Sequence, residues 1–401
     1  MNNTSLAITV MVVSLLVSLL VYPAVLRYAK KHNIVDNPNA RKLQRVPVPV
    51  LGGVVVYIGF LLGVLTLSLF LYSHFILWGV IGMTVMMVIG VWDDVRDLSP
   101  ALRFLIEVGM ILAFILTTDI YIDDPHGLWG IKELPEWLGI TISTVFGVGL
   151  INAVNMIDGM DGYSSGYVML ASIIFGLVFW SVWSTLMVCL AMIMVGALLP
   201  FFLHNVFGVR SKMFMGDGGS MMLGILMAIF AFFSLSSKTP CASMEKEGMS
   251  VPAFVLAVMC IPVFDTLRVM FMRMFRGKSP FQPDKTHLHH LIIDMGFSHL
   301  GASLFILMMN TSVVAIWWGM WMTGVSPDTQ MIVVLLVGSL ITFGFYKFMK
   351  VQQNGGPKDE EGFPQGTAIW HLFCRFGNWT HREDKRFWRT MRYIMDGPAN
   401  L

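Results

Sequence analysis

The sequence predicts an all-α, polytopic membrane helix bundle with about 11 transmembrane helices. Of its 401 residues, 56% are hydrophobic and 13% are charged, and the mean hydropathy is +0.69. Several stretches approach or exceed about 18 nearly uncharged residues, the length that crosses a bilayer as a helix. A water-soluble core would not need so many uniformly apolar segments, so the composition excludes an ordinary soluble domain.

Eleven apolar spans account for most of the chain. We place them at residues 6–28, 51–72, 75–92, 102–118, 138–154, 163–182, 185–202, 220–236, 251–270, 302–323 and 331–349. No positive charge precedes the first span, unlike in a cleaved signal peptide, so we expect that it is retained. The four cysteines lack metal-like spacing and indicate neither a disulfide framework nor a zinc site.

Lysine and arginine are distributed unequally between the two sides of such a bundle. With the N-terminus outside, the outside turns hold only Lys132, Lys238 and Lys246, and the other 24 of the 27 Lys and Arg residues fall inside. Cytoplasmic segments of membrane proteins carry the excess of basic residues. The sequence therefore predicts an outside N-terminus and a cytoplasmic C-terminus.

The end of the chain differs from the rest in composition. We divide the chain into a membrane-embedded domain, residues 1–350, and a cytoplasmic tail, residues 351–401, that begins with a Gly-rich acidic linker. Beyond the linker, aromatic residues alternate with arginine and lysine. Such a pattern could stack on RNA bases, but we favour an amphipathic segment on the anionic inner leaflet. Membrane lipids are therefore expected partners, and nucleic acid is not.

One short polar run between two apolar spans is the most informative stretch. Asn152, Asn155, Asp158 and Asp161 follow one another at three-residue spacing, which places them along one side of a helix end. A single Asp costs about 3 kcal/mol at the middle of a membrane helix, so the group should lie in an aqueous site. The alternative is a polar cap where the chain turns at the interface.

Two acidic motifs fall on the same predicted side of the membrane. Asp93 and Asp94 end one span, where neighbouring carboxylates suit a divalent cation, or one acid that binds metal and one that acts as base or nucleophile. Asp217 lies in a Gly-rich turn that opens a later span, although an ordinary capped turn would look similar. Mg²⁺ is the natural metal for a donor set made of oxygen atoms.

Two basic or imidazole-rich segments also face this side. His287, His289 and His290 could hydrogen-bond phosphate or sugar hydroxyls, whereas their spacing matches no familiar zinc motif. The basic loop that contains Arg45 precedes Pro47, Pro49 and two glycines. Simple positive-inside topology is the competing explanation for each basic residue there.

Taken together, these motifs resemble the polyprenyl-phosphate N-acetylhexosamine-1-phosphate transferase family. The resemblance lies in five segments in the family's order: RK-x-x-x-x-P-x-P-x-x-GG, WDD-x-x-D, NAVNMIDGMDG, FMGDGGS and PFQPDKTHLHH. The His-Leu-His-His form is closer to the WecA/TagO-like branch, whose donor is UDP-GlcNAc, than to the MraY-like phospho-MurNAc-pentapeptide transferases. The tail lies outside the resemblance.

The resemblance implies an Mg²⁺-dependent glycosyl-1-phosphate transferase of the bacterial cytoplasmic (inner) membrane, with Mn²⁺ as an alternative metal. Such an enzyme moves a sugar-1-phosphate from a UDP-N-acetylhexosamine to undecaprenyl phosphate, releases UMP, and initiates envelope polysaccharides such as lipopolysaccharide O-antigen or teichoic acid. A homodimer is left open.

The family's functional residues map onto matching positions of this sequence. The resemblance implies metal contacts from Asn155 and Asp217 and a catalytic role for Asp93 or Asp94. The implied substrate-binding residues are Arg45, Arg103, Asn152, Asp158, Asp161, His287, His289 and His290. Of these, Asp158 and Asp161 would form a uridine pocket, and the histidines would line the sugar-phosphate region.

Two questions stay open at this level. An Asp could attack the β-phosphate covalently or could deprotonate the lipid phosphate for direct attack, and we lean slightly to direct attack because phosphate monoesters lose their second proton near pH 6. A secondary transporter is the rival of a different class. Transporters, however, place their acids at mid-membrane and often repeat their halves, and neither feature is visible here. A CDP-alcohol phosphotransferase does not match the residues around Asp158.

Overall fold

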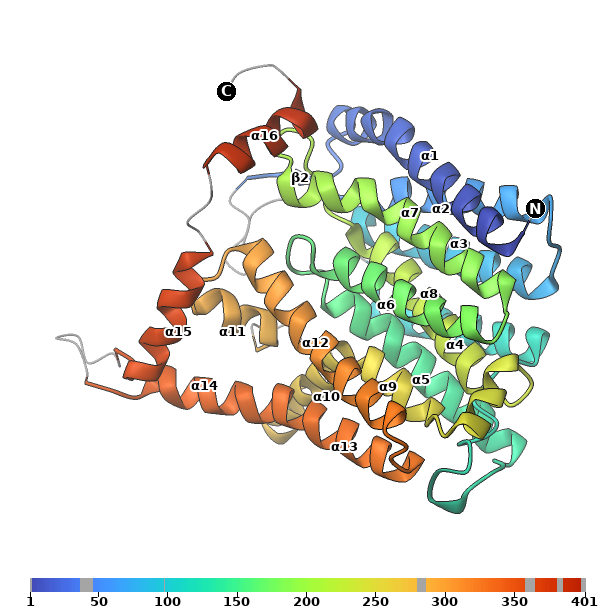
Figure 1. The fold of residues 1–401 in the computed structure, drawn as a ribbon. Coiled ribbons are helices and arrows are strands. Elements are labelled where there is room, and N and C mark those ends of the chain that lie inside the picture. Colours follow the sequence, from blue (N-terminus) through green and yellow to red (C-terminus); the bar gives the residue numbers. More distant parts are fainter. Residues whose placement is uncertain are drawn as a thin grey trace.

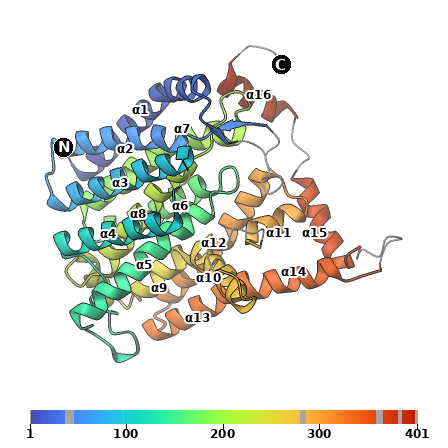
Figure 2. The same ribbon diagram turned by 180° about the vertical axis from the view of Figure 1, so that it is seen from behind.

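The computed structural model describes residues 2–36, 46–96, 98–279, 286–357, 365–380 and 385–397. Its helices run side by side along one direction and form a bundle (Figures 1 and 2). The two strands, β1 (Val35–Asp36) and β2 (Val48–Pro49), form a short antiparallel pair. The all-α fold class is therefore confirmed.

In the part of the chain that the structure describes, the bundle contains fourteen α-helices from residue 3 to residue 354. They are α1 (Asn3–Lys31), α2 (Gly52–Ser68), α3 (His74–Arg96), α4 (Pro100–Thr118), α5 (Glu136–Met156), α6 (Tyr163–Ser181), α7 (Thr185–Phe207), α8 (Gly216–Leu235), α9 (Val251–Val258), α10 (Cys260–Phe275), α11 (Leu288–Asp294), α12 (His299–Met322), α13 (Pro327–Ser339) and α14 (Phe345–Asn354). A π-helical turn, η3 (Leu340–Gly344), joins α13 to α14, and 3₁₀ turns η1 (Leu128–Gly130) and η2 (Pro240–Glu247) lie in the connections.

All eleven predicted spans correspond to helical segments. Within the described residues, nine helices are long and apolar enough to cross a membrane, and α9 with α10 forms a tenth candidate that is bent by 74°. The helix α2 is apolar but shorter. The last candidate runs from Pro327 to Asn354, so it extends past the end predicted at residue 349.

The bend between α9 and α10 departs from the straight span predicted at 251–270. Pro262 has no N–H to donate, so the helix cannot continue its hydrogen-bond pattern across this point. Asn310 of α12 fills the gap, because its side chain donates to the carbonyl of Val258 at 3.0 Å and accepts from the N–H of Ile261 at 3.0 Å. The break is therefore satisfied by a neighbouring helix, as membrane depth requires.

The helix α8 occupies the centre of the bundle. In its most apolar window 94% of the residues are buried, and it packs chiefly against α3 and α5. Gly90 of α3 lies against Gly218 of α8 so closely that an added Cβ would overlap the Gly218 backbone. Small residues at such crossings let membrane helices approach and gain packing energy.

The loop before α8 is held by the segment that carries the predicted proline motif. The N–H of Phe214 donates to the carbonyl of Pro49 at 2.8 Å, and the N–H groups of Gly52 and Gly53 donate to the carbonyls of Phe214 and Met215. The proline-and-glycine motif thus braces the turn that leads into Asp217.

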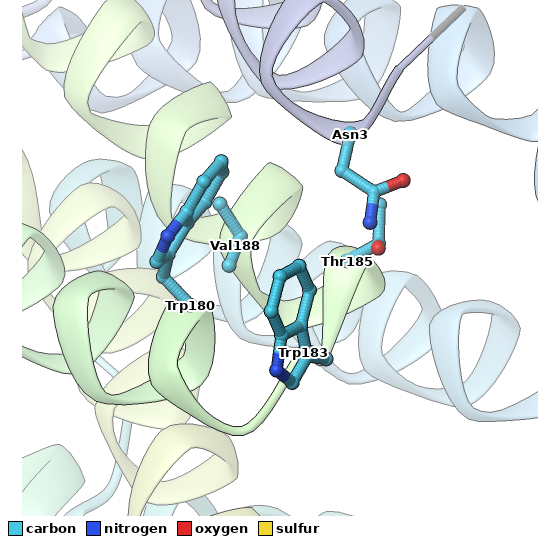
Figure 3. A pocket seen from close by; sticks show the side chains of 5 residues that line it. All are labelled: Asn3, Trp180, Trp183, Thr185 and Val188. Atoms are coloured by element: carbon cyan, nitrogen blue, oxygen red, sulfur yellow. The ribbon is translucent and has the colours of Figure 1, made fainter.

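The opposite end of the bundle carries ordinary polar loops. Lys238 contacts Asp119 at 2.6 Å, and His126 contacts Glu245 at 2.8 Å. A shallow hollow of about 240 Å³ at this end lies between the start of α1 and the α6–α7 turn (Figure 3). Its lining is largely apolar and includes Trp180 and Trp183, residues typical of a membrane interface.

The end of the chain forms two further helices, α15 (Ala368–Trp379) and α16 (Lys385–Asp396). In Figure 1 both lie at the same end of the bundle as the start of α8. The buried side chain of Trp370 anchors α15 to the bundle, and Phe373 contacts Phe345 of α14 with ring centroids 6.1 Å apart. The division of the chain at residue 351 stays a prediction.

We expect that Gly90→Ala destabilises the bundle by about 1–3 kcal/mol, because the added methyl group must push α3 away from α8. Thermal unfolding in detergent measures the effect. Gly109→Ala in α4 is the matched control, since nothing lies within 4 Å of a Cβ added there. An equal response of the two variants would contradict the close crossing.

Candidate active site

The predicted acidic motifs meet where three helices end. Asp93 and Asp94 close α3, and Asp217 opens α8 after Gly216, which adopts a φ of +75° that favours glycine. The carboxylate of Asp94 accepts hydrogen bonds from the backbone N–H groups of Asp217 (3.1 Å) and Gly218 (3.5 Å). Asp94 therefore caps the positive end of α8 and positions Asp217.

Arg103 links these acids. Its Nη1 atom lies 3.3 Å from Asp93 Oδ2 and 3.5 Å from Asp217 Oδ2, and its Nε donates to Glu107 Oε1 at 3.1 Å. The backbone N–H of Leu98 also donates to Asp93 Oδ1 at 2.6 Å. One guanidinium thus serves several carboxylates, and the group keeps a surplus of negative charge.

The two asparagines of α5 complete this group. Asn155 Nδ2 donates to Asp217 Oδ1 at 3.0 Å and to Ser220 Oγ at 2.7 Å. Asn152 Nδ2 donates to Glu107 Oε2 at 2.5 Å. Asn155 therefore contacts the metal-ligand candidate directly, whereas Asn152 acts on Arg103 through Glu107.

The loop that follows α5, residues 157–162, carries the two other acids of the run. Asp158 accepts a hydrogen bond from Ser164 Oγ. Asp161 lies between the nitrogen atoms of two basic side chains, with Lys212 Nζ at 2.6 Å and His299 Nδ1 at 2.8 Å. The two neighbouring aspartates are thus in different electrostatic environments.

The histidine motif adjoins this loop. A Cβ added at Gly159 would lie 3.2 Å from His289 Nε2, so the loop backbone passes beside that ring. His289 lies next to His290 and His287, with ring centroids 4.3 and 5.6 Å away. His287 Nδ1 lies 2.9 Å from Asp265 Oδ2, which orients its ring.

The structure thus brings the predicted residues into two adjoining groups. The first contains Asp93, Asp94, Arg103, Asn152, Asn155 and Asp217, and the second contains Asp158, Asp161, His287, His289 and His290. Repulsion between Asp158 and the carboxylates of Asp217 and Asp94 connects the groups electrostatically. Arg45 lies outside the described residues.

Comparison with known proteins finds a family to which part of the chain is similar. Residues 76–235 match the model of glycosyl transferase family 4, a segment that runs from α3 to the end of α8 and contains the first group of residues. This part of the chain is therefore similar to glycosyl transferase family 4. The histidine motif lies beyond the matched segment.

The alignments with curated relatives span most of this chain and most of each relative. The chain is 29% identical over 304 residues to the "Probable undecaprenyl-phosphate N-acetylglucosaminyl 1-phosphate transferase" of Bacillus subtilis (strain 168), which covers 75% of this chain and 80% of the relative. It is also 29% identical over 332 residues to the undecaprenyl-phosphate alpha-N-acetylglucosaminyl 1-phosphate transferase of Escherichia coli (strain K12), with 80% and 85% covered.

Several residues of the candidate site were not among the sequence predictions. Glu107 and Asp265 are each a single acid within a predicted apolar span, and that isolation is a signal of function in membrane helices. Asp265 is paired with Arg268 at 2.7 Å as well as with His287. Lys212 and His299 have no such signal, because only the fold brings them to Asp161.

The first group offers a donor set that fits Mg²⁺. The atoms of this group that could bind a metal are carboxylate and amide oxygens. Among the described residues, Asp94 has no cationic side chain within ion-pair distance. In the part of the chain that the structure describes, no three His, Cys, Asp or Glu side chains converge as in a closed protein cage. Mg²⁺ is usually held by one or two carboxylates plus substrate phosphates, so such a cage is not required.

The environment of Asp158 shifts its titration. Burial raises the pKa of its carboxyl well above the usual range, and the negative charges of Asp217 and Asp94 act in the same direction against the hydrogen bond from Ser164. Because the folded-state pKa exceeds the unfolded value, the folded state binds this proton more tightly. Its contribution to stability is therefore present at acid pH and is lost as the pH rises through the folded-state pKa.

We expect Asp158→Asn to unfold at a higher temperature than the parent protein at pH 8 and at a similar temperature at pH 4, because the amide carries no charge to bury. Thermal unfolding in detergent across this pH range is the measurement.

Asp161→Asn is the matched control. Burial opposes ionisation of Asp161, but its contacts with His299 and Lys212 hold the pKa of its carboxyl below the usual range, so its stabilising effect is present near neutral pH. That substitution should lower the unfolding temperature at pH 8. The same direction of change in both variants would contradict the different environments.

Proposed function

We propose that this protein transfers GlcNAc-1-phosphate from UDP-N-acetylglucosamine to undecaprenyl phosphate at the cytoplasmic face of a bacterial inner membrane and releases UMP. The observation that carries the proposal is a set of contacts at one end of the bundle: Arg103 pairs with Asp93 and Asp217, Asn155 donates to Asp217, and Asp94 accepts from the Asp217 N–H. The activity for which the relatives are named supports the choice of sugar and lipid.

The location of the group suits a reaction between a soluble and a membrane-bound substrate. The sugar nucleotide comes from water, whereas the lipid phosphate stays at the membrane surface. A site at the helix ends is reached by both. The basic-residue distribution in the sequence supports a cytoplasmic position for this end and an outside N-terminus.

A bound Mg²⁺ would be held by Asp217 and Asn155, with Mn²⁺ as an alternative. The metal would supply a positive charge that neutralises the diphosphate and stabilises charge developing on the transferred phosphoryl group. Asn155 holds Asp217 by a hydrogen bond, and the N–H groups of α8 hold Asp94 beside it. These contacts set the positions of the ligands before the substrate arrives.

The protein's own charges place the reacting groups. In the proposed reaction a phosphate oxygen of the lipid bonds to the β-phosphorus of the sugar nucleotide, and the bond to the α-phosphate oxygen of the departing UMP breaks. Arg103 can contact phosphate oxygens from its position between Asp93 and Asp217. We favour direct attack by the lipid phosphate, with Asp94 accepting a proton where one is present, over a covalent aspartyl intermediate.

The second group of residues is proposed to bind the rest of the donor. Asp158 and Asp161 would face the uridine, and His287, His289 and His290 the sugar phosphate. Asn152 supports Arg103 through Glu107. Arg45 is proposed as a further phosphate contact on sequence grounds alone.

The test of the function is UMP release by the purified protein in lipid nanodiscs. We expect release that requires Mg²⁺, undecaprenyl phosphate and UDP-N-acetylglucosamine together, and a lipid diphosphate product that carries the sugar. A donor panel that includes UDP-MurNAc-pentapeptide separates the family's branches. Uptake of a solute without UMP release would instead indicate a transporter.

Asp217→Asn should reduce turnover by at least about 100-fold in a protein that still elutes as a folded species, because a neutral amide is a poor ligand for Mg²⁺ beside a diphosphate. UMP release at rising Mg²⁺ is the measurement. Near-normal turnover at saturating Mg²⁺ would remove Asp217 from the metal site.

Asp93→Asn and Asp94→Asn should differ by at least about tenfold in turnover, with the larger loss at Asp94. Asp93 is already paired with Arg103, whereas among the described residues Asp94 accepts hydrogen bonds from backbone N–H groups and has no cationic partner. Rate measurements on both variants decide this. Small and equal losses would show that the pair has a structural role only.

A further inference from the structure

We propose that α15 and α16 act as a strap that positions the loop 157–162 by holding the residues that precede Lys212 and His299, the two ion-pair partners of Asp161. The term strap denotes these two helices. The inference rests on the proposed function only for its effect on substrate binding, because the contacts themselves are independent of any activity.

The first attachment point of the strap is the start of α12. Thr380, the residue after α15, accepts a hydrogen bond from the N–H of Ser298 at 3.0 Å, and Ser298 Oγ lies 3.3 Å from Thr380 Oγ1. Phe376 of α15 contacts Phe297, with ring centroids 5.6 Å apart. Ser298 is the N-cap of α12, and the next residue is His299.

The second attachment point is the turn between α7 and α8. The carboxylate of Asp396, the last residue of α16, accepts from the backbone N–H groups of Val209 (2.9 Å), Arg210 (3.2 Å) and Ser211 (2.9 Å) and from Ser211 Oγ (2.7 Å). Three successive N–H groups that face one anion form a strong site for negative charge. Trp388 adds an aromatic contact with Phe207 at 5.1 Å.

The turn is held from two sides. Tyr22 and Lys30 of α1 donate to the carbonyls of Ser211 and Arg210 at 2.7 Å each. Asp396 alone holds the N–H side among the described residues. The hydrogen bonds from Ser211 and the turn keep the pKa of Asp396 below its usual range, so the carboxylate is charged at neutral pH.

Both attachment points converge on Asp161. Ser298 precedes His299, and Ser211 precedes Lys212. Among the described residues, His299 and Lys212 are the basic side chains whose nitrogen atoms lie within 2.8 Å of the Asp161 carboxylate. Each partner of Asp161 is therefore one residue away from a backbone group that the strap holds.

This arrangement gives the strap a positioning role. A surface ion pair contributes little when its partners must be ordered for it, whereas partners held in advance lose less entropy on pairing. Asp161 lies near the end of the loop 157–162. The same loop carries Asp158, and its backbone at Gly159 lies beside His289. Release of the strap should therefore loosen the proposed donor pocket and leave the carboxylate group around Arg103 intact.

Amide exchange on the full-length protein in nanodiscs tests the attachment directly. Asp396→Ala should speed exchange of the 209–211 amides by about tenfold, the change that a loss of roughly 1.4 kcal/mol gives. Asp396→Asn, which keeps an acceptor oxygen without the charge, should give a smaller change. Asp328→Ala, which removes a comparable cap from the Trp129 N–H at the far end of the bundle, should leave these amides unchanged. Unchanged exchange in Asp396→Ala would overturn the proposal.

Steady-state kinetics tests the positioning. Asp396→Ala and Lys212→Ala should each raise the KM for UDP-N-acetylglucosamine about fivefold and change kcat less than about twofold. The double variant should be no worse than either single one, because both remove the same constraint. Additive effects, or a fall in kcat with constant KM, would overturn the positioning role. If the parent protein releases no UMP, the proposed function fails, while the exchange experiment still decides whether the strap is attached.

Discussion

The close approach of three aspartate carboxylates, two of them paired with the same guanidinium, constrains this end of the molecule. Asp93, Asp94 and Asp217 repel one another, and Arg103 together with the N–H groups at the start of α8 compensates only part of their charge. The helices α3, α4 and α8 must therefore end at the same level, with their backbones close enough for these contacts. The close crossing of α3 and α8 at Gly90 makes that approach sterically available. The remaining negative charge suits a site that binds a cation together with an anionic substrate.

The position of this group follows from the membrane. A charged cluster inside the hydrocarbon layer would be costly, whereas the same residues at the helix ends can be hydrated. The central helix α8 is apolar along its whole length and carries its single acid in its first turn. Packing on all sides of α8 thus holds Asp217 in place without placing any charge at mid-membrane.

Much of this architecture could be predicted from sequence. The apolar spans are visible as uncharged stretches, and because the chain crosses the membrane in alternating directions, their order predicts the five motifs on one side. The bend before Pro262 was missed, although the proline was its visible cause, since the compensating Asn310 lies on another helix. The partners of Asp161 were missed for the same reason, as nothing near Lys212 or His299 in the chain marks them. Glu107 and Asp265 were recognisable as isolated acids in apolar spans.

The helix from Pro327 to Asn354 has a consequence for how the chain can vary. Its 28 residues would measure about 42 Å as a regular helix, whereas the hydrocarbon layer is about 30 Å thick. The end that leads to α15 therefore projects into the aqueous layer unless the helix is strongly tilted. Each residue of a helix advances the chain by about 100°. An insertion or deletion of one residue before Asn354 would rotate the departing chain to another side of the helix axis. The number of residues in this helix therefore fixes the direction in which the chain leaves it toward α15.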